Sequence, residues 1–354
     1  MESITSFVSF IGQEVEDAEE ESFLLFSQDI PSSNLGFVDS KATSVDISIH
    51  DQEYTVHQSP TLLSSSRAGG TTGAVLWKIT PLFAEWLSDQ LSNPLWTHSI
   101  LRPSSTVVEL GCGISALTAL AISPLLEPHG NGDGHYIATD QEYVHRLFRQ
   151  NLLSNPPRSS ASASTRKSKA QPKGKRGQKP STTTTNTGSN ESENTNTNPH
   201  QNITFTSLDW ETDHPETLKQ QVQHQSNPSQ HNGGGNGDDE EGSDEEDNGF
   251  DILLSCDCIY NEALISPFVR ACAEIARLRP IFSPNTDGSP LTHGRRKKPT
   301  ICIIAQQQRS PDVFEAWLRE TMRYFRVWRV ADDVLGERLG VGSGYLVHVL
   351  VLKT

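Results

Sequence analysis

Two glycines followed at a distance by an acid form the part of this sequence best suited to binding a nucleotide-like ligand. Residues 106–110 have the composition of a buried strand, and Gly111-Cys112-Gly113 follow it directly. A Cβ would block the approach of a ligand to the backbone at such a turn, and glycine reaches the required dihedral angles at little cost. Asp140 ends a second short apolar run, 27 residues after Gly113. Its carboxylate could accept hydrogen bonds from both hydroxyls of a ribose.

The segments that would position these residues alternate between strand-like and helix-like patterns. Strands are predicted at residues 106–110, 136–140, 203–207, 251–255, 300–305, 326–330 and 345–352. Helices are predicted at residues 81–91, 115–126, 143–153, 262–278 and 312–324. In the first of them, one apolar stripe would consist of Phe83, Trp86, Leu87 and Leu91. The alternation predicts an α/β fold with a Rossmann-like sheet of seven strands. The Gly-rich residues 336–344 join the last two strands and predict a terminal antiparallel hairpin.

Segments of different composition precede and interrupt this pattern. An amino-terminal extension covers residues 1–70, and within it residues 23–26 and 45–49 have strand character. The remaining residues, 71–354, form one predicted catalytic domain. Polar segments with little to bury interrupt that domain and are predicted to be disordered, namely residues 155–200, 212–249 and 281–299.

Charge and composition exclude several classes of function. The formal net charge of −15 argues against a general DNA-binding surface, which is usually basic, and favours a basic protein as the partner. No apolar run approaches the roughly 18 residues of a membrane span. The amino terminus has no pattern of a signal peptide.

The cysteines favour a reducing compartment. Their number is five, and all lie in apolar segments, which predicts free thiols in the cytoplasm or, alternatively, the nucleus. Cys256 and Cys258 are close in sequence, but no second cysteine pair or spaced histidine cluster supports a metal site. We therefore predict no metal.

Five short segments share a pattern with one enzyme family. They are Gly73-Ala-Val-Leu-Trp77, Val108-Glu-Leu-Gly-Cys-Gly113, Ala138-Thr-Asp140, Leu208-Asp-Trp210 and Asp257-Cys-Ile-Tyr260. Together they resemble the protein-lysine methyltransferases among the class I S-adenosylmethionine-dependent enzymes. Residues 23–29 and 35–39 also resemble the fungal branch called ribosomal lysine N-methyltransferase 5. The resemblance implies S-adenosylmethionine as the cofactor and a large-subunit ribosomal protein as the substrate, with possible contact to the ribosome.

The resemblance also implies a role for each residue of the cofactor segments. Gly111 and Gly113, with Cys112 between them, would approach the amino-acid portion of the cofactor, and Asp140 would hold its ribose. Trp210 would pack on the adenine, because an indole offers a large flat face to a purine.

Two further residues would complete the cofactor site. Cys256 would line the pocket at the end of the fourth strand, and Trp77 would close the pocket from the other side. Simpler interpretations stay open: Trp77 as ordinary packing, Asp209 as a turn cap, and Glu109 as a charge satisfied by neighbouring backbone amides.

The segment Asp257-x-x-Tyr260 would lie nearest the reaction. Enzymes that methylate amino groups of nucleic-acid bases tend to carry two prolines between the acid or Asn and the aromatic residue. Cys258 and Ile259 replace those prolines, so a flexible lysine fits better than a planar base. We expect Asp257 to position the amine or accept a proton from it, and Tyr260 to wall the lysine channel. Alternatively, Asp257 caps the helix that follows.

Other chemistries lack their motifs. The sequence contains no G-x-S-x-G elbow, no phosphate-binding G-x-x-x-x-G-K-[ST] loop and no H-E-x-x-H helix. A nicotinamide fingerprint permits Ala116 at its third position, so the glycines alone do not exclude a dehydrogenase. The segments around Trp210 and Asp257 favour the methyltransferase. The alternative from a different class is a non-catalytic, cofactor-binding interaction protein built on a methyltransferase frame.

Overall fold

A computed structural model gives the fold of this chain. It describes residues 2–29, 35–66, 71–127, 134–157, 199–218, 249–279, 298–340 and 342–353. Most of the three predicted polar inserts lies outside these residues. The short helix η4 (Pro215–Thr217) lies at the beginning of the second one.

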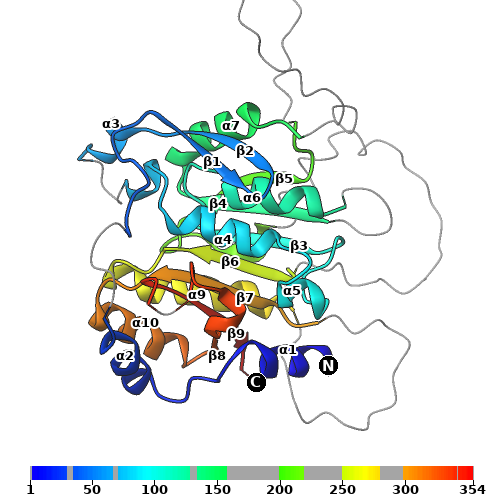
Figure 1. Cartoon of the computed structure of the whole chain (residues 1–354), viewed down its shortest axis with the longest axis vertical. Coiled ribbons are helices and arrows are strands. Elements are labelled where there is room, and N and C mark those ends of the chain that lie inside the picture. Colours follow the sequence, from blue (N-terminus) through cyan, green and yellow to red (C-terminus); the bar gives the residue numbers. More distant parts are fainter. Residues whose placement is uncertain are drawn as a thin grey trace, which may run out of the picture.

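A seven-stranded sheet forms the centre of the molecule (Figure 1). Its strands, in spatial order, are β5 (Ile203–Ser207), β4 (His135–Asp140), β3 (Thr106–Leu110), β6 (Ile252–Cys256), β7 (Ile301–Gln307), β9 (Tyr345–Leu352) and β8 (Phe325–Arg329). The first five are parallel to one another. β9 is antiparallel to both of its neighbours, β7 and β8. The predicted seven-stranded α/β fold with an antiparallel end is therefore confirmed, and the last strand enters the sheet between two earlier ones.

Helices cover both faces of the sheet, which explains why its central strands are mostly apolar and are buried along almost their whole length. One face packs against α1 (Glu2–Ile11), α4 (Ile79–Ser88), α6 (Leu117–Ile122) and α7 (His145–Ser154). The other packs against α2 (Ala18–Phe26), α9 (Ile265–Arg277) and α10 (Pro311–Thr321). The shorter elements are α3 (Pro60–Leu63), η1 (Thr72–Ala74), α5 (Pro94–Thr97), η2 (Ser123–Leu125), η3 (Glu142–Val144), η5 (Glu262–Leu264) and α11 (Asp332–Leu335).

The predicted helices form with shifted ends. The helix predicted at residues 81–91 is α4, which ends at Ser88. Phe83 and Leu87 are buried as its stripe predicts, but Leu91 lies beyond the helix and is 92% exposed, so its assignment to the stripe is wrong. In the part of the chain that the structure describes, no helix is both long and apolar enough to cross a membrane.

The amino-terminal residues pack into the same core as the sheet. Residues 45–49 form part of β1 (Ser44–Ile49), which pairs with β2 (Gln52–His57) as predicted for a strand. The strand predicted at residues 23–26 is wrong, because this segment is the last turn of α2. Asp17 caps that helix by accepting hydrogen bonds from two backbone amides, both at 2.9 Å, and acids follow in its first turn. Such a cap and such charges stabilise a helix start.

The two ends of the parallel strands differ. At their amino ends, β4, β5, β6 and β7 are preceded by residues 134, 199–202, 249–251 and 298–300. The carboxyl ends of the same strands meet at the opposite edge. The turns there carry Gly111, Gly113 and Asp257.

Candidate functional site

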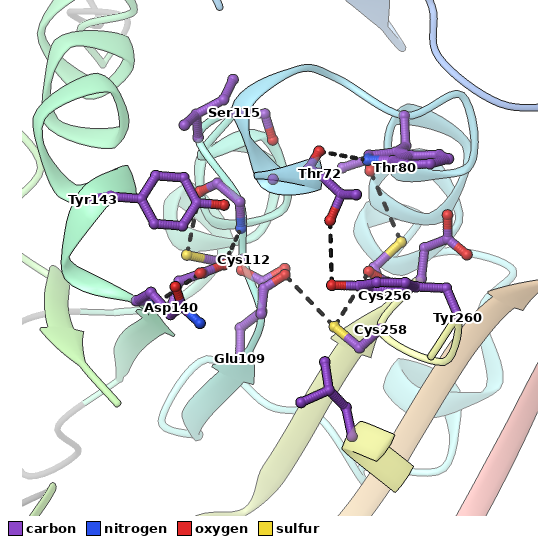
Figure 2. A pocket seen from close by; sticks show the side chains of 18 of the residues that line it. Thr72, Thr80, Glu109, Cys112, Ser115, Asp140, Tyr143, Cys256, Cys258 and Tyr260 are labelled. Carbon is purple, nitrogen blue, oxygen red and sulfur yellow. Dashed lines mark hydrogen bonds between the residues drawn. The ribbon is translucent and has the colours of Figure 1, made fainter. Parts of the chain in front are cut away.

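A pocket opens where the carboxyl ends of β3, β4 and β6 meet (Figure 2). Its volume is about 1050 Å³, including space open to solvent. All nine residues singled out from the sequence line it: Trp77, Gly111, Cys112, Gly113, Asp140, Trp210, Cys256, Asp257 and Tyr260. Segments far apart in the sequence thus contribute to one cavity.

The glycine turn after β3 requires glycine at its first position. Gly111 has φ +71° and Gly113 has φ +60°, a region that L side chains rarely adopt. A Cβ at Gly111 would lie 2.3 Å from Cys258 Sγ and 3.3 Å from a ring carbon of Trp210. The turn therefore leaves room for the tryptophan only because position 111 has no side chain.

Asp140 is fixed by the turn that it faces. Its Oδ2 accepts a hydrogen bond from the backbone N–H of Gly113 at 2.8 Å, and its Oδ1 accepts one from Gln141 N–H at 2.7 Å. Burial raises the pKa of Asp140 to about 6, and these two amide bonds oppose the rise. Because a carboxylate oxygen has two lone pairs, each oxygen keeps one for a ligand hydroxyl.

Trp210 is held at its backbone and at one edge of its ring. Its carbonyl accepts a hydrogen bond from Arg270 Nη2 at 2.8 Å, and its ring meets that of Phe268 edge to face with centroids 5.1 Å apart. The indole N–H is shielded from solvent and has no acceptor among the described residues. Asp209 accepts a hydrogen bond from Glu211 N–H at 2.9 Å, which supports its interpretation as a turn residue.

Glu109 lies in the floor of the pocket. Its Oε2 accepts a hydrogen bond from the Tyr136 hydroxyl at 2.8 Å, and among the described residues no backbone amide donates to its carboxylate. Burial raises the pKa of Glu109 to about 7, and the Tyr136 hydrogen bond opposes this rise. The side chain is thus a buried acid whose charge is costly.

Asp257 forms a buried ion pair that the sequence did not reveal. Both of its oxygens accept hydrogen bonds from the guanidinium of Arg309, at 2.5 Å each, and Oδ1 also accepts one from Gln307 N–H at 3.1 Å. Asn261 caps the next helical turn by accepting from Ala263 N–H, so the alternative role of Asp257 as that cap is wrong. Arg309 follows β7, the neighbour of the strand that carries Asp257.

The mouth of the pocket is built from side chains of distant segments. The Thr72 hydroxyl donates a hydrogen bond to the Tyr260 hydroxyl at 3.3 Å, and Trp77 Nε1–H donates to the Thr72 carbonyl at 3.0 Å. The Trp77 ring contacts that of Phe37, with centroids 4.2 Å apart, and carries Arg309 at 4.8 Å from its centroid. Trp77 is therefore a packing residue and a pocket wall at once.

The three cysteines of the pocket are neutral thiols. Burial raises the pKa of Cys112, Cys256 and Cys258, in each case above the ordinary value for a thiol. Such groups line a cavity but do not act as nucleophiles. In the part of the chain that the structure describes, no three His, Cys, Asp or Glu side chains are grouped to hold a metal ion.

The pocket has two sides. Figure 2 shows Asp140, Cys112 and Tyr143 on one side, and Tyr260, Cys256 and Thr80 on the other, with Glu109 between them. The first side belongs to the turns after β3 and β4. The second belongs to residues 72–80 and to the loop after β6.

Comparisons with known proteins support a methyltransferase. No family model matches the chain. Ribosomal lysine N-methyltransferase 5 of Candida glabrata is 24% identical over 303 residues, which cover 79% of this chain and 73% of that protein. The chain resembles a class I methyltransferase. A CurJ carbon methyltransferase structure, with a TM-score of 0.37 and 12% identity over 78% of this chain and 58% of that one, adds no argument.

One relative has a different name. A diaminohydroxyphosphoribosylamino-pyrimidine deaminase of Schizosaccharomyces pombe is 34% identical over 142 residues, or 40% of this chain, and the chain spans only 32% of that protein's length. Zinc-dependent base deaminases carry a P-C-x-x-C segment among their metal ligands. This sequence has no such segment. The name therefore gives no support for deamination by this chain.

Proposed function

We propose that the protein is an S-adenosylmethionine-dependent protein-lysine N-methyltransferase. The observation that carries the proposal is the convergence of the glycine turn, Asp140 and Trp210 with the segment 257–260 on one pocket. The name of the Candida glabrata relative supports a lysine as the acceptor and a ribosomal protein as the substrate; we propose that this substrate belongs to the large subunit.

The pocket fits the cofactor in three respects. Asp140 keeps one lone pair on each oxygen for the ribose hydroxyls, and Gly111 and Gly113 allow a ligand to approach the backbone. Trp210 offers a ring for the adenine, a stacking worth about 1–3 kcal/mol, and an indole N–H without a partner among the described residues. When bound, S-adenosylmethionine supplies an electrophilic methyl group on a sulfonium.

The protein must present the lysine as a neutral amine, because only that form has a lone pair for attack. With a lysine pKa near 10.4, the neutral form at pH 7.4 costs about 4 kcal/mol. Burial between Tyr260 and Trp77 would lower that cost, since desolvation disfavours the ammonium. Asp257 Oδ2 accepts one hydrogen bond from Arg309 and keeps a lone pair with which to orient the amine.

Two measurements test the proposal. Calorimetry with S-adenosylmethionine and its demethylated product should give saturable binding. Incubation with methyl-labelled cofactor and purified ribosomal subunits should then label a single protein band, and mass spectrometry should place the methyl groups on a lysine.

The controls separate enzyme from scaffold. Binding without transfer would favour the non-catalytic interaction protein, and no binding at all would refute both. Asp257→Ala should bind cofactor as the wild type does and transfer methyl groups at least about 10-fold more slowly, as for loss of a charged hydrogen bond of about 1.5–3 kcal/mol. Full activity in this variant would remove Asp257 from the reaction.

A further inference from the structure

We propose that Arg309 is a positioning residue that keeps Asp257 paired, so that the acceptor lysine is held in the pocket as a neutral amine. This inference rests on the proposed function and adds to it a residue that no sequence motif marks.

The contacts of Arg309 join four residues of the pocket lining into a ring, and Arg309 itself is not part of that lining. Its guanidinium pairs with Asp257 through two hydrogen bonds and lies over the Trp77 ring at 4.8 Å from the centroid. Trp77 donates to the Thr72 carbonyl, and the Thr72 hydroxyl donates to Tyr260. Tyr260 belongs to the same loop as Asp257, which completes the ring. Arg309 is the member that joins the acid to the aromatic wall.

The sheet fixes the pair in place. β6 and β7 are parallel, with Cys256 opposite Ala305, and Asp257 N–H donates to the Ala305 carbonyl at 2.7 Å. Asp257 has φ +62° and a side chain only 3% exposed, while that of Arg309 is 24% exposed. A carboxylate this deeply buried needs a partner, because an unpaired buried charge is strongly disfavoured. Arg309 is that partner before any substrate arrives.

The pairing has a consequence for an amine that enters the pocket. An unpaired carboxylate beside a lysine favours the ammonium and raises its pKa, whereas a neighbouring cation disfavours it and lowers the pKa. Arg309 acts in both ways, because it neutralises Asp257 and contributes a positive charge of its own. The lysine proton leaves to solvent, and the remaining lone pair is free to attack.

The other titratable groups around the pair limit the useful pH range. Burial raises the pKa of Tyr345 on β9 to about 12, and it raises those of Tyr260, Cys256 and Cys258 above their ordinary values. Asp140, with a pKa of about 6, and Glu109, with a pKa of about 7, titrate at or below neutrality. Between pH 7.5 and 9.5 the acceptor amine is the group expected to dominate the rate.

The test is the pH profile of kcat, which reports groups in the enzyme–substrate complex. It is measured at saturating cofactor and with purified ribosomal subunits as the methyl acceptor. Arg309→Gln should move the half-maximal pH upward by about one unit, so that kcat on the acidic limb falls about 10-fold. Asp257→Asn added to Arg309→Gln should move the profile back towards that of the wild type, since it removes the unpaired charge.

Two variants separate charge from structure. Arg309→Lys keeps the charge but not the two-pronged geometry, so it should lower kcat with little change in the half-maximal pH. Arg326→Gln is the matched control, because Arg326 pairs with both oxygens of Glu14 and lies over Trp328 at 4.9 Å on the distant β8. It should leave the profile unchanged. Should Arg309→Gln fold poorly, Asp257→Asn alone carries the test: Arg309 then keeps its positive charge without a counter-charge, so the half-maximal pH should move downward, and an unchanged half-maximal pH would overturn the inference.

The outcomes distinguish this inference from the proposed function. If wild-type protein transfers no methyl group, the proposed function is wrong. If the wild type transfers methyl groups and Arg309→Gln has an unchanged half-maximal pH, only the role of Arg309 is wrong. A uniform loss of rate at every pH would likewise show a purely structural residue.

Discussion

The two sides of the pocket are built by different means. The side with Asp140 consists of backbone turns: two glycines with positive φ and an acid whose oxygens bind two backbone amides. The side with Tyr260 consists of contacts between side chains of separate segments, and the hydrogen bond from Thr72 to Tyr260 spans 188 residues. One side depends on local backbone geometry, and the other depends on the finished fold.

This difference leads to an expectation about how each side responds to change. An added atom at Gly111 would overlap Cys258, so substitution of the turn residues or of Asp140 should weaken cofactor binding strongly. A wall of side chains can readjust, so conservative substitutions there should alter methyl transfer while cofactor binding persists. Substitutions on each side of the pocket test this division.

Gly111→Ala should cause the largest loss. The new Cβ would lie 2.3 Å from Cys258 Sγ at φ +71°, which combines overpacking of about 1–3 kcal/mol with backbone strain of about 1–2 kcal/mol. Cofactor affinity measured by calorimetry should fall on the order of 100-fold, because the added Cβ displaces the Trp210 ring from its place in the pocket. Gly336→Ala is the control: its φ is +72°, but nothing lies within 4 Å of the added Cβ. Gly336→Ala should lower the stability of the fold through backbone strain but leave cofactor affinity unchanged. Equal losses of cofactor affinity in both variants would show that the contact with Cys258 and Trp210 is not the cause.

Glu109→Gln should change the pH dependence of stability. The pKa of Glu109 is raised from 4.5 to about 7, so between these values the folded protein keeps a proton that the unfolded chain has lost. The free energy of unfolding therefore falls as pH rises through this window, by about 3 kcal/mol in total. Glu109→Gln has no carboxyl group to titrate and escapes this loss of stability. At pH 8 its free energy of unfolding should therefore exceed that of the wild type by up to about 3 kcal/mol. Urea unfolding at pH 4 and pH 8 measures it.

The control for that experiment is an exposed acid. Glu53→Gln on β2 should leave the pH dependence of unfolding as it is in the wild type. If Glu109→Gln also leaves the pH dependence of unfolding unchanged, Glu109 is not the group that lowers stability as the pH rises.

The sequence predicted well the strands that lead to the backbone side of the pocket. Strand 345–352 coincides with β9, and the other six strands of the sheet are placed within about two residues, because apolar runs bounded by turns mark buried strands. Gly111, Gly113 and Asp140 follow from strand ends in a parallel sheet, where such residues must meet. The wrong strand at residues 23–26 has a local cause. An apolar run of four residues is too short to distinguish the spacing of a helix from that of a strand. The helix cap at Asp17, six residues earlier, was the signal that identifies this segment as the end of a helix.

The side-chain half could not be read in the same way. Arg309 lies 52 residues from Asp257, and its role depends on β7 being the neighbour of β6 and on both side chains pointing to one edge. No motif contains it. A parallel arrangement of residues 251–255 and 300–305 would have placed a cation after the second strand beside an acid after the first. That inference needs the strand order, which the sequence pattern alone does not supply.

Asp140→Asn should have an intermediate effect on the cofactor. Loss of a charge-assisted hydrogen bond costs about 1.5–3 kcal/mol, which lowers affinity about 10- to 150-fold. Because burial raises the pKa of Asp140 to about 6, wild-type affinity should also fall as the pH falls through that value, since the protonated acid accepts less well. Calorimetry from pH 5 to pH 8 should show this slope in the wild type and its absence in the variant. A slope that persists would assign the titration to another group.

Tyr260→Phe should have the smallest effect and is the sharpest test of the division. It removes only the hydroxyl that accepts from Thr72 at 3.3 Å, a neutral hydrogen bond worth about 0.5–1.5 kcal/mol. Cofactor affinity should stay within about 2-fold, whereas kcat/KM for the protein substrate should fall about 2- to 10-fold. Thr72→Val breaks the same bond from the other side, so the double variant should be no worse than either single one. If cofactor affinity falls as far as kcat/KM does, the two sides of the pocket act as one site and the division is wrong.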